Sequence, residues 1–569
     1  MRWVFAIIVG AWLAVAADSA TADTIRYALS PAIENGALKA IAIEMVFAGE
    51  PDGETEIDLP GDWGGKPNLW RGISEFRVSG EGLGAVAGIE PTRKIIRHAP
   101  NAVLTVRYRL SQFWAGEPTA TGQNEYRPIV RPTYFHFIGH TAFARPNWNL
   151  ATPVSVTLRD LPSGWRFASD LEHRIAGQPL RLADILESVS VGGDFRVVKA
   201  GQLRVAIRGT WPFSDEDFIK RLKPIIASHH KFWGDPEEPF LVTVLPLLTT
   251  PGRSSLGGTA LGDSFAFFAS ANVEGGELTR ILAHEHLHTW IPRQVGTMPE
   301  QNDTADYWLS EGFADFYSYR LLLRDGMWTV NDAVAAYNKV LWSYAFSGVR
   351  NVPNTRVVRD FWNDADVNQL PYQRGFLLAA LWDYRVRQAT KGAKDLDDVM
   401  LGMKQDASGA GDLPPPPARQ LFIANMQKLG VDVSADIARF VERGEAVVLP
   451  ADAWAPCGPL STGEIAEFDR GFDGRRTIAN ANFVTGVDPA GPAYAAGLRD
   501  NMRLLRLDLS EGGDARTELV YRALAEGKEH TIRYLPEGKR HVTVQELKIT
   551  PGADEAGQKA CAARLAGTG

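Results

Sequence analysis

The sequence predicts a multidomain α+β protein, and two patterns carry this prediction. From about Thr24 to Gly209, short alternating apolar runs such as "AVLTVRYRL" are separated by Gly, Pro, Asp and Asn, which is typical of antiparallel strands. From Glu277 to about Lys428, apolar residues recur every three or four positions, which indicates helices. With 569 residues, 45% of them apolar and 22% charged, the chain is too long for one core and too apolar to be disordered.

These patterns divide the chain into segments. We predict a β-rich N-terminal domain over residues 23–210, a mainly helical domain over 211–450 and a third domain of short strands over 451–569. Ser214 is the expected N-cap of the first clear helix, and His229-His230 is expected at the end of a surface helix.

The first 22 residues have the features of an export signal. Arg2 gives a positive start, Val4 to Ala17 is apolar, and Ala20-Thr21-Ala22 supplies small residues for cleavage. The apolar stretch is shorter than the roughly 20 residues that a membrane span needs. We therefore expect an exported protein, periplasmic or secreted, with no stable membrane insertion after cleavage; an uncleaved N-terminal anchor is the alternative.

Charge and cysteine content indicate which partners and which cellular compartment to expect. The 60 basic and 68 acidic residues give a net charge of -8 without long runs of either sign, so we expect no nucleic-acid partner. In an oxidising compartment, Cys457 and Cys561 could pair and tie the C-terminal tail to the start of the last domain.

The stretch "LAHEHLHTW" predicts a metal site on a helix that Pro292 stops. Residues four apart lie on one helix face, so His284 and His288 can present imidazole nitrogens to a single ion. His286 is about 200° around the helix from His284, so it faces away, toward the protein or solvent. Glu285 lies beside the metal position without binding it, where it could take a proton from water.

A third ligand decides between a metal site and a chance pattern. Catalytic zinc takes three protein ligands and keeps a fourth position open. "WLSEGFADFYSYRLLLRDG" offers Glu311 on a second predicted helix, whose apolar stripe is Leu309, Phe313, Tyr317 and Leu321. Asp315, one turn after Glu311, could hold the far nitrogen of a ligating histidine. Mixed histidine and carboxylate ligation favours Zn2+, although another divalent ion stays open.

HExxH followed by "WLSEGFA" resembles the gluzincin metallopeptidases, and the order of the three domains resembles their glycyl aminopeptidase family. The resemblance implies a thermolysin-like catalytic domain and a C-terminal PDZ-like domain. It makes His284, His288 and Glu311 the zinc ligands, Glu285 the general base and Asp315 the aspartate behind a ligand. Asn501 replaces the usual Gly-Asp turn of PDZ domains, so both peptide capture and a packing role stay open for residues 451–569.

The segment "LPYQRGFLLAALWDYR" resembles the gluzincin pattern Y-x-K-G, with Arg374 in place of the lysine. This resemblance gives Tyr372 the role of stabilising the oxyanion. The implied reaction is peptide hydrolysis, in which zinc lowers the pKa of water toward roughly 7 and Glu285 accepts its proton.

The sequence departs from the aminopeptidase pattern in "LGGTALGDSFAFF". Gly257 and Gly258 could let an edge strand bind the substrate backbone, but no carboxylate follows them to grip a free amine. Asp263 could substitute from a shifted position. The sequence thus predicts an exported zinc peptidase, with aminopeptidase action on small N-terminal residues implied by the resemblance. A non-catalytic peptide-binding protein on the same scaffold is the alternative, and the oligomeric state stays open.

Overall fold

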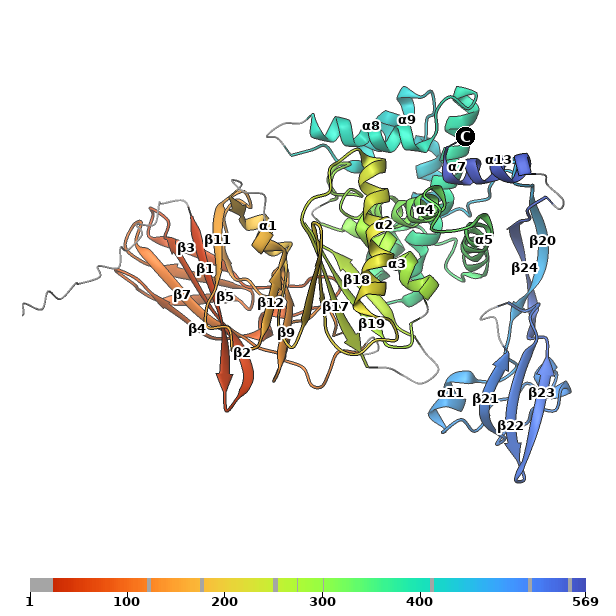
Figure 1. Cartoon of the computed structure of the whole chain (residues 1–569), viewed down its shortest axis with the longest axis horizontal. Helices are drawn as coiled ribbons and strands as arrows, with labels where there is room; N and C mark the ends of the chain where they lie inside the picture. Colours follow the sequence, from red (N-terminus) through yellow and green to blue (C-terminus); the bar gives the residue numbers. More distant parts are fainter. Residues whose placement is uncertain are drawn as a thin grey trace, which may run out of the picture. The chain divides into compact units, whose positions relative to one another are not determined.

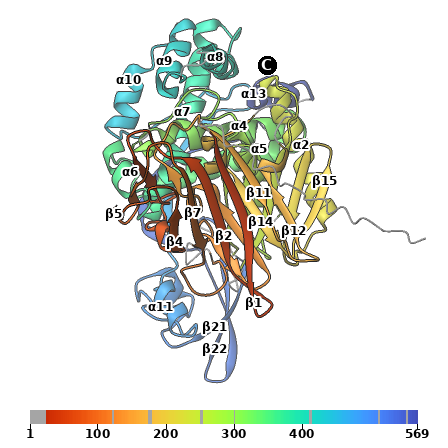
Figure 2. The ribbon, with the colours of Figure 1, turned by 90° about the vertical axis from the view of Figure 1, so that its left-hand side faces the viewer.

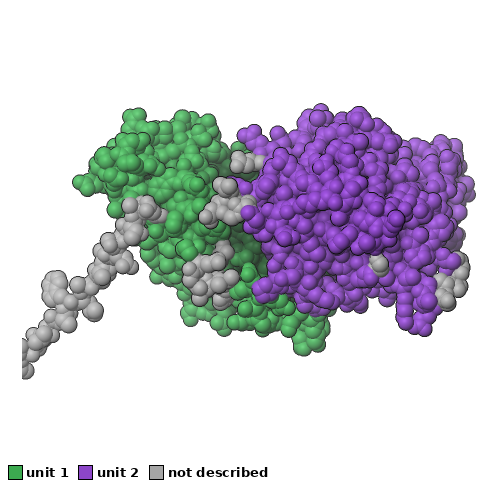
Figure 3. Space-filling model, turned by 90° about the horizontal axis from the view of Figure 1, so that it is seen from above, with its two compact units in different colours: residues 1–223, 237–281 green, residues 224–236, 282–569 purple. Residues whose placement is uncertain are grey.

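A computed structural model describes residues 24–119, 124–173, 179–248, 254–273, 275–299, 301–409, 414–509, 514–550 and 555–568. The predicted signal peptide lies outside the described residues. The chain forms two compact units, residues 1–223 with 237–281 and residues 224–236 with 282–569 (Figure 3). The fold is mixed α+β, with a β-rich N-terminal region and a helical region, as the sequence predicts.

The first unit begins with a six-stranded sheet in the order β13-β11-β1-β2-β7-β4. Its strands are β1 (Ile25–Glu34), β2 (Ala37–Ala48), β4 (Ile73–Ser79), β7 (Val103–Leu110), β11 (Pro153–Leu158) and β13 (Leu180–Arg181). Figure 2 shows β1, β2, β7 and β4 side by side. In β2 the residues Ile41, Ile43, Met45 and Phe47 are buried and alternate with partly exposed ones, so one sheet face forms a core and the other stays open.

Three further sheets complete the first unit, in the orders β10-β3-β6-β5, β12-β14-β9-β8 and β15-β16-β17-β19-β18. The bounds are β3 (Glu54–Asp58), β5 (Val86–Glu90), β6 (Arg93–Arg97), β8 (Ile129–Arg131), β9 (Tyr134–Ile138), β10 (Arg145–Pro146), β12 (Arg166–Ser169), α1 (Leu182–Leu186), β14 (Val189–Gly193), β15 (Arg196–Ala200), β16 (Leu203–Ile207), β17 (Phe240–Leu247), β18 (Leu256–Ala260) and β19 (Ser264–Ser270). The predicted strands "FLVTVLPLL" and "SFAFFAS" are confirmed as β17 and β19. β18 pairs with β19 at one end of the last sheet.

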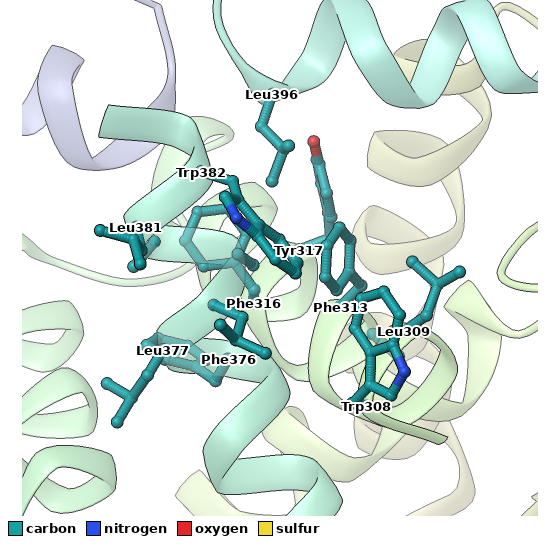
Figure 4. Close-up of a cluster of buried hydrophobic side chains, with 14 of the residues drawn as sticks. Trp308, Leu309, Phe313, Phe316, Tyr317, Phe376, Leu377, Leu381, Trp382 and Leu396 are labelled. Atoms are coloured by element: carbon teal, nitrogen blue, oxygen red, sulfur yellow. The ribbon is translucent and has the colours of Figure 1, made fainter. Parts of the chain in front are cut away.

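Helices dominate the second unit (Figure 1). The α-helices between residues 215 and 436 are α2 (Asp215–Trp233), α3 (Gly275–Leu287), α4 (Tyr307–Arg324), α5 (Val330–Phe346), α6 (Asn354–Asp360), α7 (Ala365–Thr390), α8 (Leu396–Ser408), α9 (Ala418–Lys428) and α10 (Ser434–Asp436). The Ser214 Oγ accepts a hydrogen bond from the Asp217 backbone N–H at 3.0 Å, which confirms the predicted N-cap. The predicted stripe of α4 is fully buried, and Figure 4 shows Trp308 and Phe313 of this helix beside Trp382 of α7.

Two glycines allow α4 and α7 to approach closely. A Cβ on Gly312 would lie 2.3 Å from the Gly375 Cα, and a Cβ on Gly375 would lie 2.0 Å from the Trp308 carbonyl oxygen. Any larger residue would therefore force the helices apart. This contact sets the turn of α4 that carries Glu311 against the turn of α7 that carries Tyr372.

The C-terminal part is built from strands with a core of its own. Its elements are β20 (Leu460–Phe468), α11 (Gly474–Ala479), α12 (Pro492–Ala495), β21 (Arg503–Leu509), β22 (Leu519–Ala525), β23 (Lys528–Tyr534) and β24 (Glu537–Leu547). Asn501 has a left-handed backbone with φ 68°, a conformation that Asn tolerates and that explains its place in a turn. The PDZ-like assignment itself stays a prediction.

A last helix, α13 (Glu555–Ala566), was not predicted. Its residues Cys561 and Leu565 join Trp454 in the core of the helical region, and Cys457 and Cys561 form the predicted disulfide. Among the described residues, no helix combines the length and the hydropathy needed to cross a membrane.

Candidate metal centre

The two predicted histidine ligands come from the end of α3. His284 lies in the last turn, but the helix ends at Leu287 and not at Pro292 as predicted, so His288 occupies the following turn. The His288 backbone N–H donates to the Glu285 carbonyl at 3.2 Å, one residue closer in sequence than in an α-helix. The tighter turn still leaves both rings on one side.

The ligand atoms of His284, His288 and Glu311 converge. The two histidine Nε2 atoms are 3.2 Å apart, and the Glu311 Oε2 lies 3.2 Å from that of His284 and 3.4 Å from that of His288. Tetrahedral zinc with ligands at about 2.0–2.1 Å would separate them by ~3.3–3.4 Å. The donor set therefore fits a zinc ion, as the sequence predicts.

Both histidines are fixed by a second hydrogen bond on the far side of the ring. The Nδ1–H of His284 donates to the Asp315 Oδ1 at 3.0 Å, and the Nδ1–H of His288 donates to the Ile291 carbonyl at 2.8 Å. These bonds select the tautomer whose Nε2 carries a free lone pair for a metal. Asp315 lies where the sequence places it, whereas the Ile291 carbonyl was not predicted because backbone acceptors leave no mark in the sequence.

The site has a strongly negative potential. Burial lowers the pKa of His284, but Asp315 and Glu311 outweigh burial and raise that pKa to about 10. Burial raises the pKa of Glu311, but His288 and His284 hold it well below its usual range. A buried site that favours positive charge on its histidines is suited to a cation.

Glu285 and Tyr372 complete the cluster. Glu285 is buried, with 7% of the residue exposed, and it contributes to the raised pKa of His284. The Tyr372 ring stacks on the His284 ring with centroids 5.8 Å apart. Burial raises the Tyr372 pKa well above its ordinary value, and the carboxylates of Glu311 and Glu285 raise it further. The Tyr372 hydroxyl is therefore a hydrogen-bond donor at neutral pH.

Arg374, which replaces the lysine of the Y-x-K-G pattern, is a structural residue. It is buried and donates to the backbone carbonyls of Arg350 at 3.0 Å and Val352 at 2.7 Å. These bonds anchor α7 two residues after Tyr372.

The third histidine of the motif faces the interior. His286 is buried, and its Nδ1 lies 2.8 Å from the Nδ1 of His229 on α2. His229 and His230 lie in the last turns of α2, as expected, but the expected surface position was wrong: both are buried, and their rings pack against Trp290. The sequence near a helix end suggests exposure. The segment that covers these histidines contains Trp290, which lies 60 residues further along the chain, so its contact could not be predicted from the helix itself.

Gly257 and Gly258 belong to β18 in the first unit. A Cβ on Gly258 would lie 2.2 Å from the Phe265 ring, so the strand requires glycine there. Asp263 lies in the turn of the β18–β19 hairpin, whereas Gly257 pairs with Phe268 at the opposite end. Asp263 is thus poorly placed to replace the missing carboxylate.

Another carboxylate lies beside this strand. Tyr126 donates a hydrogen bond to the Gly258 carbonyl at 2.7 Å, and Glu125 precedes it in the chain. Burial raises the Glu125 pKa, and its Oε2 has no hydrogen-bond partner among the described residues. The sequence analysis missed Glu125 because it lies more than 130 residues upstream of Gly257 and in no motif.

Comparisons with known proteins agree with this geometry. Residues 277–369 match the family model described as M61 glycyl aminopeptidase. An aminopeptidase N family protein from Idiomarina loihiensis shares the fold with a TM-score of 0.64 and 15% identity, over 95% of this chain and 100% of that one. An M1 zinc metallopeptidase from Deinococcus radiodurans aligns over 75% of this chain and 94% of its own, with 16% identity and a TM-score of 0.46, too distant to carry an argument. No curated protein sequence matches the chain.

Proposed function

We propose that the chain removes N-terminal residues from peptides, since it is a zinc-dependent, aminopeptidase-like enzyme whose residues 277–369 match the M61 glycyl aminopeptidase family model. The observation that carries the proposal is the convergence of His284, His288 and Glu311 beside Glu285 and Tyr372. The non-catalytic alternative has no observation in its favour, because a binding scaffold needs neither a general base nor an oxyanion donor.

His284, His288 and Glu311 would hold the zinc ion. When bound, zinc supplies a Lewis acid that lowers the pKa of water and polarises the carbonyl of the substrate. Asp315 and the Ile291 carbonyl keep the two imidazoles oriented toward it.

The remaining residues move protons and stabilise charge. The Glu285 carboxylate takes a proton from the attacking water and delivers it to the leaving amine, so hydrolysis needs no covalent intermediate. The Tyr372 hydroxyl, which its raised pKa keeps protonated, donates a hydrogen bond to the developing oxyanion.

We also propose that the protein is exported, to the periplasm or outside the cell. The N-terminal sequence features support this, and so does the Cys457–Cys561 disulfide, since disulfides persist mainly in oxidising compartments.

Replacing the general base tests the mechanism. Glu285→Gln should retain zinc and lose hydrolysis by at least about 10²–10⁴-fold, the usual contribution of general-base catalysis. Glu277→Gln makes the same chemical change in the first turn of α3 and should keep full activity. Turnover of Glu285→Gln close to the wild-type value, with zinc bound, would overturn the mechanism.

Peptides of matched sequence, with free and with acetylated N-termini, test the specificity. We expect cleavage of the free peptides only. Equal cleavage of both peptides would contradict aminopeptidase action but leave zinc-dependent hydrolysis intact.

A further inference from the structure

The helix side that presents Glu311 continues toward the start of α4. Asp303, Tyr307, Glu311 and Asp315 follow one another at intervals of four residues, first in the 3₁₀ helix η4 (Asp303–Asp306) and then in α4. Residues four apart in a helix lie one above the other, so these four side chains form one stripe. The sequence analysis used only its second half.

A hydrogen bond joins the first two residues of the stripe. The Tyr307 hydroxyl donates to the Asp303 Oδ2 at 2.8 Å, and the Thr304 backbone N–H donates to the Asp303 Oδ1 at 2.8 Å. The Tyr307 ring packs edge to face against the Phe361 ring, with centroids 4.9 Å apart. Because both carboxylate oxygens and the tyrosine ring have fixed partners, the Asp303 carboxylate is held in one orientation.

The negative charge of Asp303 has no counter-ion among the described residues. Its carboxylate accepts the two hydrogen bonds given above, and no lysine, arginine or histidine forms an ion pair with it. Burial raises the pKa of Tyr307, and the carboxylates of Asp303 and Glu311 raise that pKa further. Both acidic side chains therefore lie close to the same hydroxyl group.

This part of the stripe is accessible from solvent. Asp303 and Tyr307 are both partly exposed. The side chains of the metal ligands His288 and Glu311 are also partly exposed, at 12% and 15%. A peptide that is held at the metal centre can therefore contact Asp303.

We propose that Asp303 binds the side chain of a lysine or arginine of the peptide substrate, and that Tyr307 orients the carboxylate for this contact. The inference rests on the proposed peptidase function. An ammonium or guanidinium group supplies the positive charge that Asp303 lacks, and it forms charge-assisted hydrogen bonds with a carboxylate. A carboxylate that is already oriented loses little freedom when the cation binds.

Distance favours a side chain over the free amino group of the peptide as the source of the cation. At about 1.5 Å per residue, the stripe places Asp303 roughly 12 Å from Glu311 along the helix axis. In an aminopeptidase the free ammonium belongs to the residue whose carbonyl is attacked, so it lies within about 3.6 Å of that carbonyl. The long side chains of lysine and arginine extend farther from the cleaved bond.

Peptide binding to zinc-loaded Glu285→Gln protein tests the proposal without depending on hydrolysis. Calorimetric titration compares tripeptides that carry lysine, norleucine or glutamate at the first, second or third position, with glycine elsewhere. At one position or more, we expect lysine to increase the affinity about ten-fold over norleucine, as for a partly desolvated ion pair. Glutamate should lower the affinity there, and the position identifies the substrate residue that Asp303 binds.

Variants of the stripe, made in the same Glu285→Gln protein, show whether Asp303 causes the preference. Asp303→Asn should abolish the preference for lysine and leave the norleucine affinity and the zinc content unchanged. Tyr307→Phe should reduce the preference less, since it removes only the orienting donor. Asp432→Asn should keep the preference, because Asp432 is an exposed aspartate that also accepts a backbone hydrogen bond but lies outside the stripe.

The outcomes separate this inference from the peptidase assignment. Absence of a lysine preference at every position, or a preference that survives Asp303→Asn, would overturn the role of Asp303. Failure of zinc-loaded wild-type protein to hydrolyse these peptides would contradict the peptidase assignment instead, and the binding result would stand.

Discussion

Two histidine pairs meet at the end of α3 and have opposite properties: His284 with His288, and His286, which lies between them in the sequence, with His229 of α2. His284 and His288 direct their Nε2 atoms toward Glu311. His286 instead shares a short Nδ1 to Nδ1 contact with His229. The first pair lies among carboxylates, which raise the pKa of His284 to about 10, whereas burial lowers the pKa of His229 to about 3.

The difference shows that the partner of the second ring nitrogen decides what a buried histidine can do. A carboxylate or carbonyl on Nδ1 leaves Nε2 free and basic, which suits a metal ligand. An imidazole partner packed against Trp290 stabilises neither a charge nor a metal, so the His229–His286 pair holds α2 against α3 as neutral side chains.

The largest expected effect is on zinc affinity, which should depend on the His284–His288 pair with Glu311 and not on the His229–His286 pair. Glu311→Ala should weaken zinc affinity by more than ~100-fold, because it removes a ligand and not merely an outer partner. His286→Gln should keep wild-type zinc content, since its ring faces the other way. Elemental analysis after dialysis against a zinc buffer measures both. Loss of zinc from His286→Gln in folded protein would break the comparison.

A smaller effect on zinc affinity is expected from Asp315, which contacts the ligand His284. Asp315→Asn should weaken zinc affinity by about 10–100-fold, because it removes the charge that holds the His284 tautomer. Competition with a chelator of known affinity measures the change, and Asp366→Asn, an exposed aspartate in the first turn of α7, is the control. An unchanged affinity for Asp315→Asn would mean that the orientation of His284 comes from packing alone.

The sequence predicted the site better than its surroundings for a physical reason. The helix repeat brings His284 and His288 together, and an apolar stripe placed Glu311 and Asp315 on one side of the next helix. Each of these relations joins residues of one helix, so it can be predicted from the spacing of those residues in the sequence. They do not depend on the exact end of α3, and the error in that end did not move His288 out of the site.

Contacts between distant segments were not predictable in this way. The partner of His286 lies 57 residues upstream, and Glu125 lies in no motif near the glycine strand. The return of α13 to the helical core is a further case, where only the disulfide hypothesis for Cys457 and Cys561 gave a hint. Such pairings depend on how whole helices and strands pack together, and the periodicity of one segment does not predict this packing.

The smallest expected effect is a pH dependence of stability that comes from the neutral pair. The pKa of His229 falls from 6.5 to about 3 in the folded protein, through burial first and then the neighbouring His230, while Asp325 opposes the shift. Between these values the unfolded chain binds more protons than the folded one. The contribution is therefore fully present above about pH 6.5 and is lost as the pH falls, by up to about 1.4 kcal/mol per pH unit.

Urea unfolding of zinc-loaded protein between about pH 7.5 and about pH 5 isolates the contribution of His229 when wild type is compared with His229→Gln. The variant should be less stable at the upper limit and should lose less stability on acidification, since it carries no imidazole to protonate. His530→Gln, at an exposed position, should keep the wild-type slope. Parallel curves for wild type and His229→Gln would show that His229 accepts a proton in the fold, and the contrast between the two pairs would then rest on geometry alone.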